Sequence, residues 1–257
     1  MNVQPQLLHQ RVGHLQPGKS PRVGFAGTAV EMRAAQRLRY DIFVGEMGAR
    51  LHNEIPGLDH DHLDPHCHHL LVWEPLTGQL IGCTRILTED GARKAGGFYS
   101  QGEFDIDPVL TLPGRFAEIG RTCVHRDHRN GATIAALWSG IAGLVATNQI
   151  DYLIGCASIP LGQDGTMAQA LFSELALRYL TPENLRVRPR IPLPRRDMLA
   201  RGDYPLPPLL KAYLRIGARI CGEPFLDADF QVADVFILVS TRQLERRYAR
   251  HFLERTG

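Results

Sequence analysis

One segment of the sequence combines a candidate strand, a polar turn and a candidate helix, with charged residues at the junction. Residues 116–124 read FAEIGRTCV, the following turn contains Arg126 and Arg129, and an apolar run then continues to about residue 148. The first backbone N–H groups of a helix are unpaired and carry the positive end of its dipole, so this junction is suited to bind a phosphate or pyrophosphate. Because many α/β units share the pattern, an ordinary strand–helix turn with solvated arginines is the alternative.

The same candidate strand carries an acid and a base three residues apart, Glu118 and Arg121. A carboxylate can accept the proton of an amine as a general base. A guanidinium can hold that carboxylate, or bind the carboxylate of a substrate through two parallel hydrogen bonds. The alternative is a structural ion pair without a chemical role.

A loop upstream of this strand is rich in carboxylates and histidines. The carboxylates could recognise a substrate ammonium group or could cap turns in a solvated loop. The histidines and a cysteine have spacings that can bind zinc, but the loop is irregular and the sequence offers no partner cluster elsewhere, so we assign no metal. The carboxylates are Glu54, Asp59, Asp61 and Asp64, and the candidate metal ligands are His60, His62, His66, Cys67, His68 and His69.

Apolar periodicity predicts the elements that must position these residues. Short apolar runs predict strands, of which the first two form a hairpin, and spacing at three and four residues predicts helices. Their order predicts a single α/β (α+β) domain. The predicted strands are 70–73, 80–87, 116–124, 151–157 and 232–240, and the predicted helices are 30–43, 132–148, 166–180, 209–220 and 243–254.

The domain prediction places a flexible N-terminal tail at residues 1–20 and one domain at 21–257. Within that domain, residues 181–208 are a proline- and arginine-rich insertion, and residues 243–254 are a basic terminal helix. Acidic partners would be drawn to these basic stretches, whereas no nucleic-acid-binding motif accompanies the arginines, so we expect no nucleic-acid partner.

Composition limits the class of protein. The 257 residues are 44% hydrophobic and 22% charged with a net charge of +2, which is typical of a globular protein. Five widely spaced cysteines without a C-x-x-C motif favour reduced thiols in a cytosolic protein. The N-terminus lacks the apolar core of a signal peptide, and the longest apolar stretch, 132–146, is shorter than the ~20 residues that span a bilayer, so we expect a buried helix there.

Several motifs together resemble the ornithine-lipid N-acyltransferases, often labelled hemolysin-like, of the GNAT superfamily. The strand that leads through Arg129 to Gly131 and Ala132 is similar, loosely, to the acyl-carrier grip of GNAT enzymes. The resemblance covers most of residues 30–240 but is poor at 160–205. The motifs are RLRYDIFVGEMGA (37–49), GLDHDHLDPHCHHLLV (57–72), GCTRIL (82–87), GGFYSQGEFDI (96–106), EIGRTCVHRDHRNGATIAALWSGIA (118–142), DYLIGCAS (151–158) and LPPLLKAYLRIGARI (206–220).

The resemblance implies a GNAT-like fold, with a mixed, mostly antiparallel sheet, flanking helices and a splayed strand pair. It also implies transfer of a (3-hydroxy)fatty acyl group from an acyl-carrier-protein thioester to the α-amine of L-ornithine, forming lyso-ornithine lipid. Acyl-carrier protein or acyl-CoA would be a co-substrate, and no cofactor is expected. Such an enzyme would be cytoplasmic, and its basic stretches would favour peripheral contact with an anionic inner membrane face.

The family is related to the acyl-homoserine lactone synthases, whose residue pattern assigns roles here. Those synthases carry a tryptophan soon after the phenylalanine of the pattern, whereas the first tryptophan here is Trp73, which counts against a lactone product. Another amino acid or S-adenosylmethionine as acceptor, and a lipid-sensing module without activity, are the alternatives. The implied catalytic residues are Glu118 and Arg121; the implied substrate-binding residues are Arg39, Phe43, Asp59, Asp64, His69, Arg85 and Phe104; and the implied phosphopantetheine-binding residues are Val124, Arg126, Arg129, Asn130, Gly131, Ala132 and Thr133.

Overall fold

A computed structural model describes residues 20–51, 55–195 and 204–242. Its main feature is an eight-stranded sheet in the order β1-β2-β3-β5-β6-β10-β8, with β9 paired to β10. All neighbouring strands are antiparallel except β5 and β6. The strands are β1 (Arg22–Phe25), β2 (His68–Trp73), β3 (Leu80–Thr88), β5 (Phe116–Val124), β6 (Tyr152–Pro160), β8 (Arg219–Ile220), β9 (Phe225–Asp227) and β10 (Val232–Ser240).

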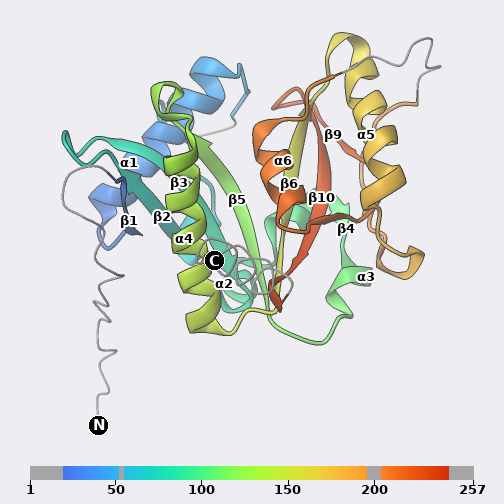
Figure 1. The fold of residues 1–257 in the computed structure, drawn as a ribbon, viewed down its shortest axis with the longest axis horizontal. Coiled ribbons are helices and arrows are strands. Elements are labelled where there is room, and N and C mark those ends of the chain that lie inside the picture. Colours follow the sequence, from blue (N-terminus) through green and yellow to red (C-terminus); the bar gives the residue numbers. More distant parts are fainter. Residues whose placement is uncertain (1–19, 52–54, 196–203, 243–257) are drawn as a thin grey trace, which may run out of the picture.

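The two parallel strands, β5 and β6, separate part-way along their length (Figure 1). They pair only from Phe116 opposite Tyr152 to Glu118 opposite Ile154, although both strands continue for several residues. Gly155 follows the last pair with φ +157°, and a Cβ atom there would lie 2.3 Å from the carbonyl oxygen of Ile119. Only glycine fits this close approach, so the sequence marks the point where the sheet opens.

Helices cover both faces of the β1–β5 half of the sheet. On β2, Leu70 and Val72 belong to the core that includes α4, whereas Leu71 belongs to the core that includes α1. Because successive strand residues point to opposite faces, α1 and α4 lie on opposite sides, and Figure 1 shows α4 in front. The bounds are α1 (Ala29–Tyr40), continued by a π-helical turn at Asp41–Glu46, and α4 (Gly131–Asn148).

The other half of the sheet is covered by shorter helices. Helices α5 and α6 pack against β6, and α5 also packs against β8. A separate two-stranded sheet joins β4 to β7. These elements are α5 (Thr166–Tyr179), α6 (Pro208–Arg215), α2 (Glu89–Ala95), α3 (Asp107–Leu110), β4 (Phe104–Asp105) and β7 (Arg188–Pro189).

The α/β class, the mostly antiparallel sheet, the flanking helices and the splayed strand pair are confirmed. The predicted helix 209–220 is wrong at its end, because Gly217 with φ +100° follows the helix and residues 219–220 pair with β10 instead. The edge strand β1 and the pairing of β7 within the proline-rich segment were not predicted. The predicted tail, apart from Ser20, and the predicted terminal helix lie outside the described residues.

Within the described part of the chain, α4 alone is long and apolar enough, by length and composition, to cross a membrane. In the fold this helix packs against β1, β2 and β3. Its burial against the sheet agrees with the predicted core helix.

Candidate active site

A cavity of ≈ 800 Å³ opens where β5 and β6 part. Its wall includes β5 from Glu118 to Val124, and Cys156 and Ser158 of β6. The π-helical turn after α1, the start of α4 and helix α6 complete the lining. Past Glu118, the edge of β5 has no partner on β6, so backbone groups on that edge are available to a ligand.

Glu118 sits at the closed end of the strand opening and lines the cavity. Its two carboxylate oxygens accept hydrogen bonds from the backbone N–H groups of Tyr99, at 2.6 Å, and Ser100, at 2.8 Å. The side chain is 3% exposed. Burial raises its pKa, while hydrogen bonds from Ser100 and Tyr99 oppose that effect. A fixed carboxylate with a raised pKa is suited to accept a proton near neutral pH.

Arg121 lies at an irregularity in β5. The β3–β5 register shifts between Cys83 and Arg85, and Arg121 has φ +51°, so β5 bulges at this point. Its guanidinium lies 5.0 Å from the ring centroid of Tyr99 and 5.1 Å from that of Phe230. Arg121 also lines the cavity. The bulge therefore brings Arg121 to the same cavity as Glu118.

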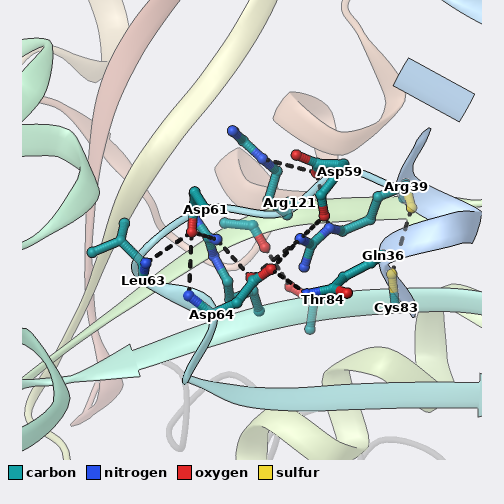
Figure 2. Close-up of polar contacts among 12 residues, drawn as sticks. Gln36, Arg39, Asp59, Asp61, Leu63, Asp64, Cys83, Thr84 and Arg121 are labelled. Carbon is teal, nitrogen blue, oxygen red and sulfur yellow. Dashed lines mark hydrogen bonds and ion pairs between the residues drawn. The ribbon is translucent and has the colours of Figure 1, made fainter. Parts of the chain in front are cut away.

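Most of the loop carboxylates form a buried network with arginines (Figure 2). We call it the arginine–aspartate network; its members are Arg39, Asp59, Asp61, Asp64, Arg85 and Arg121. Arg39 contacts Asp59 at 2.9 Å and Asp64 at 2.8 Å. Arg85 contacts Asp64 at 2.8 Å and Asp61 at 2.6 Å, and Arg121 lies 3.1 Å from Asp59. Burial raises the pKa of Asp64, but Arg39 and Arg85 outweigh it, so the net shift is downward.

The predicted substrate-binding residues therefore fall into two groups. Arg85 and Phe43 line the cavity. Arg39, Asp59 and Asp64 are buried behind the wall in the network, and His69 hydrogen-bonds through Nε2 to the Asp64 carbonyl oxygen at 2.9 Å. Phe104 is fully buried against Phe225 and Phe236. These last five residues are not part of the described cavity lining.

The start of α4 also borders the cavity. Asn130 caps the helix, because its Oδ1 accepts from the N–H groups of Ala132, at 3.0 Å, and Thr133, at 3.1 Å. Arg129 pairs with Glu46 at 2.5 Å, and Arg126 lies 3.4 Å from the same carboxylate. Of the predicted phosphopantetheine-binding residues, Val124, Arg129, Asn130 and Gly131 line the cavity, whereas Arg126, Ala132 and Thr133 do not line its described part.

Comparison with known proteins identifies the family. Residues 38–139 match the family model described as Acetyltransferase (GNAT) domain. A protein of Rhodobacter capsulatus named L-ornithine N(alpha)-acyltransferase is 33% identical over 92% of this chain and 96% of its own length. The chain belongs to the L-ornithine Nα-acyltransferase family. The predicted family is thereby confirmed, and the protein is an acyltransferase of the GNAT type.

Solved structures place this acyltransferase in the same fold as more distant enzymes. A CoA-dependent acyl-homoserine lactone synthase, BjaI, covers 91% of this chain and 89% of its own, with a TM-score of 0.51 and 16% identity. FeeM, an N-acyl amino acid synthase from uncultured soil microbes, covers 88% of this chain and 94% of its own, with a TM-score of 0.50 and 14% identity. At these identities the likeness concerns the fold.

One group of residues at the acyltransferase cavity was missed by the sequence analysis. Glu103, Asp227 and Asp234 bring three carboxylates within 4.8 Å of one another, and we call them the acidic cluster. Asp227 and Asp234 line the cavity. The three residues come from distant segments and share no motif, so only the fold brings them together. Among the described residues, no member of the histidine-rich loop belongs to a comparable grouping of metal-ligand type.

Proposed function

We propose that this acyltransferase moves a (3-hydroxy)fatty acyl group from an acyl-carrier-protein thioester to the α-amine of L-ornithine, forming lyso-ornithine lipid. The observation that carries the proposal is the position of Glu118, a buried carboxylate at the head of a cavity between two parted strands. The acceptor is supported by relatives at 32–34% identity that are named for L-ornithine.

In the proposed reaction, the α-amine must first lose a proton, because an ammonium group has no lone pair with which to attack. Glu118 takes that proton, directly or through one water molecule. The neutral nitrogen then attacks the thioester carbon, the C–N bond forms and the C–S bond breaks. The nitrogen loses a second proton as it becomes the amide, and the departing sulfur takes up that proton as the free thiol, so no covalent enzyme intermediate is needed.

The charge that develops on the thioester oxygen needs fixed donors. The open edge of β5 at residues 122–124 supplies backbone N–H groups beside the cavity. The start of α4 would hold the phosphopantetheine phosphate, with Arg129 and the N-terminal N–H of Gly131 nearest the cavity. The donor arm would thus run along the opening between the strands.

Arg121 is suited to bind the α-carboxylate of the amino acid from the cavity wall. Arg85 and Phe43 would line the acceptor side. Arg39, Asp59 and Asp64 would act behind them, since their ion pairs hold Arg85 and Arg121 in place. His69 and Phe104 would support the wall from the interior.

Acyl carrier protein is the proposed donor because Arg129, Lys211 and Arg215 line the cavity and carrier proteins are acidic. The proposed location is the cytoplasm, with peripheral contact at the anionic inner membrane face. Exposed arginines of the proline-rich segment, including Arg188 and Arg190, would favour that contact.

The test is to incubate purified protein with acyl-carrier-protein thioester and a panel of amino acids, and to identify the product by mass. We expect Nα-acylornithine. Glu118→Gln should lower kcat by about 10²–10⁴-fold while thioester binding persists. The control is Glu183→Gln, at an exposed site.

Turnover of Glu118→Gln at the parent rate would remove the base assignment. Acylation of another amine with no acylornithine would replace the acceptor and favour the lactone-synthase-like alternative. Thioester binding without thiol release in the presence of any amine would favour a sensing role.

A further inference from the structure

The acidic cluster combines burial with access to the active-site cavity. Glu103 precedes β4, Asp227 ends β9 and Asp234 lies in β10. Their exposed fractions are 5%, 8% and 4%. Carboxylates are rarely so buried unless they are paired or bind a ligand. Three of them in one cluster, two of which line the cavity, therefore need a partner.

Within the described part of the chain no cation forms an ion pair with the cluster, although the charge of Arg121 favours the ionised form of Asp234 from a longer distance. Asp234 accepts a hydrogen bond from Ser158 at 2.7 Å, and Asp227 accepts from the backbone N–H groups of Asp229 and Phe230, both at 2.9 Å. Glu103 Oε2 is buried and has no hydrogen-bond partner among the described residues. Within the same described ranges, no arginine, lysine or histidine lies at ion-pair distance from any of the three.

The pKa values of two carboxyl groups in the cluster are raised by this environment. Burial raises the pKa of Glu103 to about 8, with the neighbouring Asp234 adding to the effect and contacts with Cys156 and Tyr99 opposing it. Burial likewise raises the pKa of Asp234 to about 6, opposed by the Ser158 hydrogen bond. Each shift reports a charge that the folded protein leaves without sufficient stabilisation. A bound cation would supply that stabilisation.

The arginine–aspartate network differs from the acidic cluster, because its carboxylates are paired with arginines. Asp59, Asp61 and Asp64 are held by arginines, so their charge is already balanced. From the sequence, these loop carboxylates were candidates either to recognise a substrate ammonium group or to cap turns. The structure instead leaves the members of the acidic cluster as buried carboxylates without an ion-pair partner among the described residues.

We propose that the acidic cluster binds the side-chain ammonium group of the amino-acid acceptor and thereby selects a diamino acid such as ornithine. This inference rests on the proposed function, because it assumes that an amino acid is the acceptor. The cluster is then a specificity site, separate from Glu118, which acts on the α-amine.

The geometry favours an ammonium group. One oxygen from each of the three carboxylates lies within 4.8 Å of the other two. If all three separations were 4.8 Å, an atom at the centre of the triangle would lie about 2.8 Å from each oxygen. That is a normal N–H···O distance. An ammonium group has three donors, one for each carboxylate.

The distance along β6 also fits a short diamino acid. Glu118 lies opposite Ile154. Further along β6, Cys156 neighbours Glu103 and Ser158 donates a hydrogen bond to Asp234. The cluster therefore lies two to four strand residues beyond Ile154, a span of about 7–13 Å. An acceptor with its α-amine at Glu118 would therefore carry a short aliphatic chain along β6 toward the acidic cluster.

The test compares ornithine with norvaline, which has the same carbon chain but lacks the second amine. The variants are Glu103→Gln and Asp234→Asn, with Asp105→Asn as an exposed control on the adjacent strand. We expect the wild type to prefer ornithine in kcat/KM by about 100-fold, and each variant to lose at least about ten-fold of that preference. The rate with norvaline should change by less than about three-fold, which shows that the variant is folded and retains its chemistry.

Calorimetric binding of ornithine to the protein without thioester gives a second readout, in which the variants should weaken Kd by about ten-fold or more. If the wild type acylates ornithine but the variants keep their preference, the inference is overturned and the proposed function stands. If the wild type acylates no amino acid, the proposed function fails, and the binding measurement alone decides the inference. Binding of Ca²⁺ or Mg²⁺ at the cluster without binding of ornithine would also overturn the proposal, in favour of a metal site.

Discussion

Buried charges in this protein fall into two kinds, and the difference separates structural from ligand-binding residues. Those of the arginine–aspartate network are matched by opposite charges a few ångströms away. The carboxylates of the acidic cluster have no opposite charge at such a distance among the described residues. A buried charge without a partner costs free energy of folding, so such a group persists where a ligand uses it.

The first prediction concerns Arg39, which is 1% exposed and pairs with two aspartates. Arg39→Ala should lower the free energy of unfolding by about 3–5 kcal/mol, because it removes a buried cation from two buried carboxylates and leaves Asp59 only Arg121 and Asp64 only Arg85. The matched control is Arg93→Ala, whose ion pair with Asp90 is exposed and should contribute less than about 1 kcal/mol. Urea unfolding measures both. Unchanged stability with a raised KM for the acceptor would instead make Arg39 a direct substrate contact.

The second prediction concerns pH. Glu103, which faces Asp227, Asp234, Cys156 and Tyr99, has a pKa of about 8 in the folded protein, above the ordinary value of 4.5. Between about pH 5 and pH 8 the folded state keeps a proton that the unfolded chain has lost, so this group makes stability fall as pH rises. Its favourable contribution is fully present below the ordinary pKa and is lost on passing the folded value.

Glu103→Gln cannot titrate and should remove this part of the slope. The difference in unfolding free energy between variant and wild type should therefore grow in favour of the variant by about 1–3 kcal/mol from pH 5 to pH 8. Urea unfolding at several pH values measures it, and the titrating groups that do not interact with Glu103 cancel in the difference. Parallel curves for the two proteins would show that Glu103 is ionised throughout.

At the scale of elements, the active site depends on one break in the sheet. Strands β5 and β6 are parallel neighbours for three residue pairs and then separate. Strand β5, on one side of the opening, has a bulge at Arg121. The close approach of Gly155 to Ile119 determines where the opening begins. The cavity follows from these backbone features rather than from any single side chain.

The third prediction tests that point. Gly155→Ala would place a Cβ atom 2.3 Å from the Ile119 carbonyl oxygen, so the strands must shift. We expect a loss of about 3 kcal/mol in unfolding free energy and a lower kcat, because Glu118 is held by the adjacent pair. Gly143→Ala is the control: it lies in α4 with no atom within 4 Å of the added Cβ, and should gain about 0.5–1 kcal/mol. If Gly155→Ala were as stable and active as Gly143→Ala, the close approach would not determine the opening.

The sequence predicted elements whose signal is local. The strands at 116–124 and 232–240 and the helix at 166–180 follow from apolar periodicity, and the structure has them within a residue. Helix α6 ends early because pairing of Arg219–Ile220 with β10 is a long-range interaction that local spacing does not contain. Glu118, Arg121 and the start of α4 were candidates from the sequence because one motif connects them along the chain, and the fold brings all three to one cavity. The acidic cluster was not, because Glu103 and Asp234 meet only through the fold.

At the scale of the whole molecule, the small net charge conceals an uneven distribution. The cavity lining includes both signs of charge, with Arg129, Lys211 and Arg215 at the start of α4 and on α6, and Asp227 and Asp234 on β9 and β10. The proposed substrates have the same polarity, since the donor carries a phosphate on an acidic protein and the acceptor carries an ammonium group. Opposite charges at different parts of one cavity would orient the two substrates before any bond forms.

The last prediction tests the donor side of this arrangement. The double variant Arg129→Ala and Lys211→Ala should raise the KM for acyl-carrier protein by about ten-fold at low ionic strength, because both cations border the cavity while the carrier is acidic. The effect should shrink at about 0.5 M salt, where charges more than a few ångströms apart are screened. The KM for an acyl-pantetheine thioester, which lacks both the phosphate and the carrier, should change little. Arg93→Ala with Lys94→Ala removes the same charge from exposed positions on α2 and serves as the control. An equal rise in KM for both donors would place these cations against the acyl chain or the acceptor, and the acidic carrier would then have to dock elsewhere on the molecule.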